Sequence, residues 1–212
     1  MLEKNLASNI SELKSLMQVQ NSCFINFPLH FHDEIQFLEL FFDKTIEINV
    51  FSKNHILMTN SIHYMNLAKR IFGSEPTELV FLPKSKLLPT KRPYAKDFYG
   101  DLLVSYSADR KLRISSSPDL NEELTINLKT STNGTFYVDI DKGTVSNNNE
   151  LVSFTPFKYS LLGGRIYQSI LNSSSPYLRL DYSLNLQLQI LEELGSLYFG
   201  NEFNSNTKIP LA

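Results

Sequence analysis

The chain has 212 residues, of which 42% are hydrophobic and 20% charged, and its formal net charge is −2. This composition is typical of a folded protein with a sizeable core, and no run of eighteen apolar residues predicts a membrane span. The first residues are polar, unlike a secretion signal, and the single cysteine, Cys23, cannot form an internal disulfide. We therefore expect an intracellular protein, cytoplasmic or nuclear, that does not contact a membrane.

The first third of the chain combines helical and extended patterns. Apolar residues recur at spacings of three and four over 2–19, which predicts an amphipathic helix. Alternation of apolar and polar residues predicts a strand over 45–51, and a short apolar run predicts another over 56–59. A second amphipathic helix is predicted over 61–72, because Gly73 provides its stop signal.

The segment 84–96 has an unusual concentration of charge, and a predicted buried strand over 79–82 leads into it. It contains five basic residues and no acidic residue, and its two prolines exclude a helix. We predict an exposed loop. Its basic side chains and one tyrosine are the candidate residues for contact with a partner: Lys84, Lys86, Lys91, Arg92, Tyr94 and Lys96.

The most regular pattern of the sequence follows this loop. Alternating segments over 102–107, 112–116, 124–128 and 136–140 predict consecutive antiparallel strands. The Asn-Gly pair at 133–134 strengthens this interpretation, because both residue types tolerate the positive φ angles of a tight hairpin turn.

The last third contains less regular signals. A short strand is predicted over 151–154 and a helix over 156–172. The apolar residues after position 178 alternate first and then recur at helical spacing, so we predict a strand over 178–182 and a helix over 183–199. Residues 201–212 are predicted to form a flexible tail.

The four histidines lie close together in the sequence and raise the question of a metal site. His30 and His32 would share one face of a strand, a geometry that Zn²⁺ and Fe²⁺ sites use, and His55 and His63 follow. Glu39, the candidate carboxylate ligand, lies seven residues beyond His32. A metal-dependent enzyme that uses the histidines of segment 30–63 therefore stays open as an alternative, although we predict no metal ligand set.

The catalytic motifs that can be recognised from spacing are missing. The chain contains no Gly-x-Ser-x-Gly, Gly-x-Gly-x-x-Gly, His-Glu-x-x-His or Cys-x-x-Cys sequence. The sequence thus favours a non-catalytic function over an enzyme, and it predicts no catalytic residue and no cofactor.

We predict a single α+β domain over 1–200, with a mainly antiparallel sheet of about six to eight strands packed by three or four helices. The predicted function is that of a non-catalytic binding or adaptor protein, a subunit of a larger macromolecular assembly that contacts a protein partner through the loop 84–99. A second alternative, beside the metal-dependent enzyme, is a nucleic-acid-binding protein whose loop cations bind phosphates while Tyr94, Phe98 or Tyr99 stack on bases.

Overall fold

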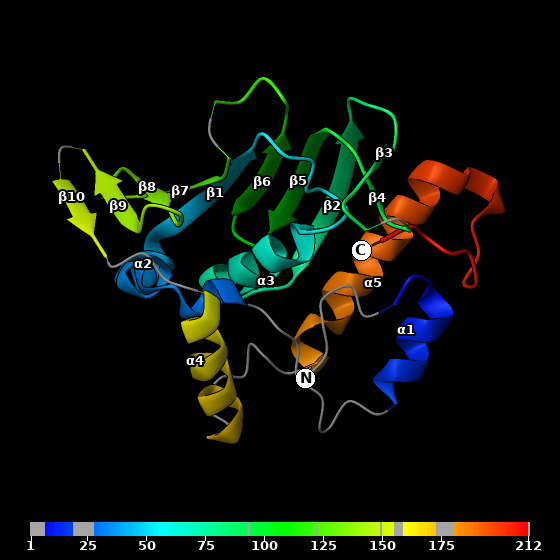
Figure 1. Cartoon of the computed structure of the whole chain (residues 1–212), viewed down its shortest axis with the longest axis horizontal. Coiled ribbons are helices and arrows are strands. Elements are labelled where there is room, and N and C mark those ends of the chain that lie inside the picture. Colours follow the sequence, from blue (N-terminus) through cyan, green and yellow to red (C-terminus); the bar gives the residue numbers. More distant parts are fainter. Residues whose placement is uncertain are drawn as a thin grey trace.

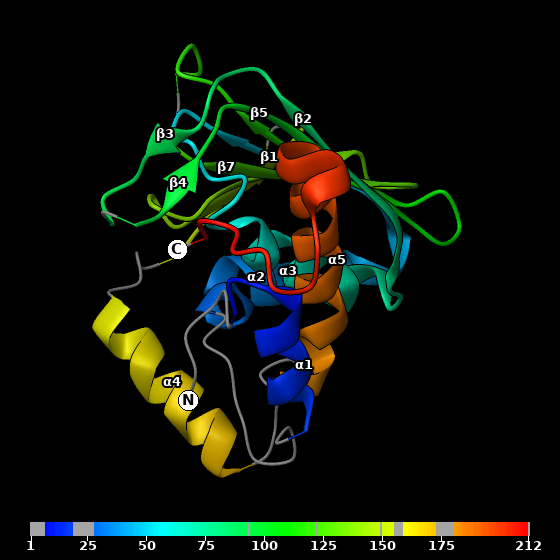
Figure 2. The same cartoon turned by 90° about the vertical axis from the view of Figure 1, so that its right-hand side faces the viewer.

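The computed structural model describes residues 7–18, 28–92, 94–121, 123–148, 150–154, 159–172 and 180–211. An eight-stranded sheet forms its centre, and helices lie against one face of that sheet (Figures 1 and 2). The sheet has the strand order β10-β9-β8-β7-β1-β6-β5-β2, and a separate pair consists of β3 and β4. The strands are β1 (Thr45–Ser52), β2 (Pro76–Pro83), β3 (Leu88–Pro89), β4 (Lys96–Asp97), β5 (Gly100–Tyr106), β6 (Lys111–Ser116), β7 (Thr125–Thr130), β8 (Thr135–Asp139), β9 (Thr144–Asn147) and β10 (Glu150–Ser153).

Two helices, α3 and α5, pack against each other beneath the sheet, and α5 also contacts β2 (Figure 2). Helix α1 packs on α5, and α4 contacts the short helix η2. No helix among the described residues is long and apolar enough to cross a membrane. The helices are α1 (Ile10–Met17), η2 (Pro28–Phe31), α2 (Asp33–Phe37), η3 (Leu38–Lys44), α3 (Ser61–Phe72), α4 (Tyr159–Leu171), α5 (Leu180–Phe199) and η5 (Gly200–Glu202).

The prediction of a mainly antiparallel sheet was wrong, because the sheet is mixed and has a parallel pair at its centre. Strand β1 lies between β6 and β7 and runs parallel to β6 but antiparallel to β7. Val50 is the Cα partner of Ile114 on one side and of Ile126 on the other. The segments 112–116 and 124–128, which we predicted to be neighbours, are therefore separated by a strand that occurs much earlier in the chain.

Several local predictions are confirmed and others need correction. The helix predicted over 61–72 forms as α3, and Gly73 ends it with a φ of 65°. Residues 57–60, by contrast, form a turn instead of a strand. Residues 180–182 belong to the first turn of α5, and the buried Leu180, Leu184 and Leu191 follow a helical spacing. Residues 2–6 of the predicted N-terminal helix lie outside the described residues.

The core lies between the helices and the inner face of the sheet. Val50, Leu102, Ile114 and Ile126 point to this face, and each is 0% exposed. Met65 of α3, also 0% exposed, belongs to the same cluster. Burial of each such side chain contributes about 1.5–3 kcal/mol to folding, so the sheet provides a firm support for the turns at its edges.

The C-terminal segment returns to the body of the protein. The backbone N–H of Ile209 donates to the carbonyl oxygen of Ser8 (2.8 Å), and that of Lys96 donates to the carbonyl oxygen of Pro210 (2.9 Å). Ile209 itself is 1% exposed. These contacts place residues 209–211, part of the predicted tail, beside α1 and the β3–β4 pair. The extent of the single domain over 1–200 stays a prediction.

A buried polar network joins η2, α3 and α5. The Nε2–H of His30 donates to Asn66 Oδ1, and the Asn66 amide nitrogen donates to Ser183 Oγ (2.7 Å). An Arg70 guanidinium nitrogen lies 3.3 Å from His30 Nδ1 and donates to it, which requires the neutral imidazole. Burial lowers the pKa of His30 to about 3. The Arg70 charge also lowers this pKa, whereas the hydrogen bond with Asn66 acts to raise it.

This network predicts a loss of stability in acid. Below pH 6.5 the unfolded chain protonates His30 while the folded protein does not, until the pH approaches 3. Stability should therefore fall with decreasing pH across this window, by up to about 1.4 kcal/mol per pH unit from this residue. Urea unfolding of the protein and of His30→Gln at several pH values measures this loss of stability. If the stability of the two proteins depended on pH in the same way, His30 would not be its cause.

Candidate functional site

A cavity of about 670 Å³ opens beyond the carboxyl end of β1. This volume lies within the range of small-molecule binding sites. The lining comes from the β1–α3 connection with the first turn of α3, the β3–β4 turn, the segment before β7 and the β8–β9 turn. The lining residues are Ser52, Asn54, His55, Ile56, Thr59, Asn60, Tyr64, Pro89, Thr90, Lys91, Arg92, Glu123, Leu124 and Asp141.

One buried carboxylate joins two walls of this cavity. Asp97 of β4 is 0% exposed and accepts hydrogen bonds from the backbone nitrogens of Met58 (2.9 Å) and Thr59 (3.0 Å). It also accepts from Thr59 Oγ1 (2.7 Å) and from the backbone nitrogen of Phe98 (2.8 Å). Because these donors lie on both segments, Asp97 fixes the β3–β4 pair to the turn that precedes α3.

Two serine hydroxyls fix the opposite side of the β1–α3 connection. Ser52 Oγ donates to the carbonyl oxygen of Glu123 (2.9 Å) and accepts from the backbone nitrogen of Asn54 (3.1 Å). Ser116 Oγ donates to the carbonyl oxygen of Asn54 (2.7 Å). The connection is thus tied to the ends of β1 and β6 and to the segment before β7, which leaves the cavity with preformed walls.

The lining carries groups that can both donate and accept hydrogen bonds. His55 lies edge-on to the ring of Tyr99, with 5.6 Å between the ring centroids. Its Nδ1 is buried and has no hydrogen-bond partner within the described ranges. Asn60, which directly precedes α3, and Tyr64 in the first turn of α3 add an amide and a phenol, and Thr90 adds a hydroxyl. Such a mixture suits a ligand with several hydroxyl groups.

Charges of opposite sign, carried by different segments of the chain, line the cavity. Lys91 and Arg92 come from the β3–β4 turn, and Glu123 and Asp141 come from the segments before β7 and β9. Glu123 is paired with Lys53 at 3.0 Å. Both cations of the β3–β4 turn are exposed, and neither forms an ion pair with an acid of the described chain.

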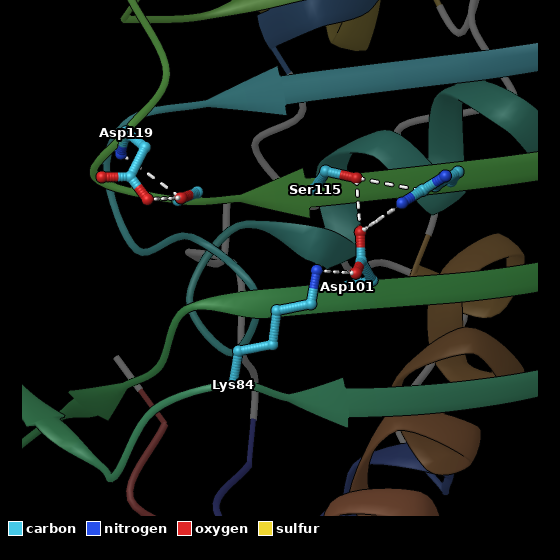
Figure 3. Close-up of polar contacts among 6 residues, drawn as sticks. Lys84, Asp101, Ser115 and Asp119 are labelled. Atoms are coloured by element: carbon cyan, nitrogen blue, oxygen red, sulfur yellow. Dashed lines mark hydrogen bonds and ion pairs between the residues drawn. The ribbon is translucent and has the colours of Figure 1, made fainter.

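Lys84, a predicted contact residue, is already paired within the fold. Its Nζ lies 2.7 Å from Asp101 Oδ2, and Arg113 lies 3.0 Å from the other carboxylate oxygen (Figure 3). Ser115 Oγ donates to the same oxygen as Arg113, at 2.5 Å. Although burial acts to raise it, these three partners hold the pKa of Asp101 down to about 2. Lys84 therefore stabilises the start of the loop.

The remaining predicted contact residues are spread over the loop. Only Lys91 and Arg92 of the six line the cavity. Lys86 is exposed, as is Tyr94 at 68%, while Lys96 is half-buried in β4. Their role in contacts with a partner stays a prediction.

The two aromatic residues at the end of the loop, Phe98 and Tyr99, are buried and half-buried instead of exposed as a stacking surface. Phe98, a candidate base-stacking platform, is 0% exposed and packs edge-on against Phe81 and Tyr198. Burial, with the nearby Asp97 charge, raises the pKa of Tyr198 to about 12. Tyr99 is half-buried beside His55. The loop is consequently anchored from beneath by its own aromatic residues.

The histidines do not converge. His30 bonds to Asn66, His32 Nδ1 lies 3.7 Å from a Glu34 carboxylate oxygen, and His55 lines the cavity. Glu39 is paired with Arg70. Within the described part of the chain, no three histidine, cysteine or acidic side chains are placed to hold a metal ion.

Sequence reasoning missed Asp97, Asn60 and Tyr64. Asp97 had a usable signal, because it is the only acidic residue in 84–99 and directly precedes Phe98. An acid next to a large apolar residue, at the end of a basic run, is a candidate for a buried anchor. Asn60 looks like an ordinary residue before the predicted helix 61–72 and Tyr64 like an ordinary position within it, and their place at the cavity follows only from the fold.

Neither a protein-family model nor a curated protein sequence matches this chain. Solved structures do match. UDP-N-acetylglucosamine 3-dehydrogenase from Acidithiobacillus ferrooxidans is 12% identical with a TM-score of 0.71, over 96% of this chain and 71% of that one. Apo scyllo-inositol dehydrogenase from Lactobacillus casei is 14% identical with a TM-score of 0.61, over 90% and 68%. The super-repressor mutant of Gal80p from Saccharomyces cerevisiae is 12% identical with a TM-score of 0.64, over 94% and 69%.

These comparisons correct the predicted function. An adaptor subunit that acts through the loop 84–99, a nucleic-acid-binding protein and a histidine-based metalloenzyme were the functions that the sequence suggested. The structure instead shares its fold with dehydrogenases and with Gal80p, and part of the loop lines a cavity. At identities of 12–14% the likeness concerns the fold alone.

Proposed function

We propose that this chain is the substrate-binding part of an oxidoreductase-type protein, and that the cavity beyond β1 binds a small hydroxylated molecule such as a sugar or a cyclic polyol. The observation that carries the proposal is this cavity, with preformed polar walls, in a fold shared with dehydrogenases. Two structurally similar proteins are, by name, dehydrogenases of a nucleotide sugar and of an inositol.

The cavity walls support this ligand class. A hydroxyl group is both donor and acceptor, so its binding site needs both kinds of partner at fixed positions. The amide of Asn60, the imidazole of His55 and the carboxylate of Glu123 provide them. The hydrogen bonds of Asp97 and Ser52 hold the intervening backbone, which reduces the ordering cost of binding.

A dinucleotide cofactor does not fit the described residues. Its usual site needs a glycine-rich turn between a strand and a helix, at the edge of a parallel sheet. The turn after β1 spans 53–60 and contains no glycine, and the β1–β6 pair is the one parallel pair among the described strands. We therefore assign these residues to substrate binding and derive no hydride-transfer step from them.

Binding measurements test the proposal directly. Isothermal titration with UDP-N-acetylglucosamine, scyllo-inositol and myo-inositol should show saturable binding of at least one ligand. Asn60→Ala should weaken that binding about tenfold, because it removes one hydrogen-bonding group from the cavity wall. Asn185→Ala, an exposed position on α5, is the matched control and should bind as the unchanged protein does.

Two results would contradict the proposal. The first is no heat and no rise in melting temperature with any of the three ligands. The second is binding that Asn60→Ala and Asn185→Ala affect equally, because the ligand would then lie outside the cavity. Titration with a nicotinamide dinucleotide alone should give no saturable binding to this chain.

A further inference from the structure

We propose that Lys91 and Arg92 form an anion-binding wall, so that the ligand of the cavity carries a phosphate or carboxylate group beside its hydroxyls. This inference rests on the proposed function and specifies the substrate class of the same cavity. The two side chains are consecutive in the β3–β4 turn, both line the cavity, and both are exposed.

The backbone that presents these cations is held in place. Thr90 Oγ1 accepts from the backbone nitrogen of Arg92 (3.1 Å), and the Thr90 nitrogen donates to the carbonyl oxygen of Ala95 (3.3 Å). Ala95 is 0% exposed, and Asp97, two residues further, is the buried anchor described above. A turn fixed at its base presents two cations to the cavity with little backbone entropy left to lose.

Lys91 and Arg92 line the cavity, and their charges are not neutralised by the fold as those of two nearby lysines are. Lys84 of the same loop is neutralised by Asp101, and Lys53 by Glu123. Lys91 and Arg92, by contrast, have no acidic partner among the residues that the structure describes. An arginine guanidinium matches the geometry of phosphate and carboxylate, and a neighbouring ammonium adds charge.

The distribution of charge also orients the ligand. Glu123 and Asp141 lie in segments other than the β3–β4 turn and can accept hydrogen bonds from hydroxyl groups. Repulsion from these carboxylates disfavours an anion beside them. The anionic end of the ligand should therefore face Lys91 and Arg92, and its hydroxylated end should face the acids.

The test separates the anion from the hydroxylated part of the ligand. Pyrophosphate is titrated into ¹⁵N-labelled protein at low ionic strength, and amide shifts of residues 90–92 are followed. Titration calorimetry then compares matched ligands: N-acetylglucosamine with UDP-N-acetylglucosamine, myo-inositol with its monophosphate, and glucose with glucuronate. The variant is Lys91→Ala with Arg92→Ala, and the charge-matched control is Lys86→Ala with Lys111→Ala, two exposed lysines outside the cavity.

We expect pyrophosphate to shift the 90–92 amides and the anionic member of a pair to bind about 10- to 100-fold more tightly than the neutral one. Both effects should disappear in the Lys91/Arg92 variant and persist in the control. Equal affinity of the anionic and neutral members, or unchanged binding in the variant, overturns the inference.

If neutral polyols bind in an Asn60-dependent way without preference for anions, the proposed function stands and this inference fails. If pyrophosphate alone binds, the wall stands and the proposed function fails.

Discussion

Replacing Asp97 with asparagine should lower the free energy of unfolding by about 3–5 kcal/mol. The carboxylate is 0% exposed and accepts from Met58 N, Thr59 N, Thr59 Oγ1 and Phe98 N. An asparagine offers one acceptor oxygen, and its amide NH₂ would face backbone N–H groups that need an acceptor. Buried donors would then lose their partners, which costs more than the net value of the bonds themselves.

Urea unfolding of Asp97→Asn measures this loss, and Asp119→Asn is the control. Asp119 is exposed, and its carboxylate lies 3.4 Å from Ser117 Oγ (Figure 3), so its replacement should change stability by less than about 0.5 kcal/mol. The Asp97 variant should also lose ligand binding, because the connection 57–60 would no longer be fixed to β4. Equal free energies of unfolding of the two variants would show that the hydrogen bonds of Asp97 do not stabilise the fold.

Local structure could be predicted from the sequence where the signal lies within one element. The helix 61–72 follows from the periodicity of its apolar residues and from the left-handed stop at Gly73. The hairpin between β7 and β8 was located by its Asn-Gly pair, and Gly134 has a φ of 78°. These signals act over a few residues, so no tertiary contact is needed to interpret them.

The order of the strands could not be predicted, because alternation does not specify a neighbour. Ile48 and Val50 would alternate in the same way beside any apolar strand, and only the folded sheet shows β6 and β7 on either side. The same limit applies to 178–190, where regularly placed leucines fit a strand or a helix, and burial against α1 and α3 decides for α5.

The candidate site was predicted in part. Segment 84–96 was singled out for its charge as a contact with a partner, and the structure shows that two of its cations, Lys91 and Arg92, line the cavity. Sequence could not show that the loop folds toward the β1–α3 connection, because the contacts of Asp97 with Met58 and Thr59 span almost forty residues. When that contact is not known, the sequence of a basic segment with prolines predicts an exposed loop that binds a partner.

Replacing Gly100 with alanine should destabilise the base of the same loop by about 4 kcal/mol. Gly100 has a φ of 154°, and a Cβ there would lie 2.3 Å from the Leu82 carbonyl oxygen and 3.0 Å from Pro83 Cα. Both are backbone atoms of β2, so the clash cannot be relieved by turning a side chain. Strain of this kind and an overpacked contact each cost about 1–3 kcal/mol, and their sum gives the expected loss.

Gly73→Ala separates the clash from the backbone strain. Gly73 also has a positive φ, 65°, but no atom lies within 4 Å of the position of its Cβ, so alanine there should cost only about 1–2 kcal/mol. The backbone N–H of Lys84 donates to the Tyr99 carbonyl oxygen at 2.8 Å. Its hydrogen exchange with solvent should become faster in Gly100→Ala. In Gly73→Ala, its exchange should change only as much as the global free energy of unfolding does. If both variants unfold at the same urea concentration, strands β2 and β5 can separate at Pro83 and Gly100 without penalty, and the loop does not depend on their close approach.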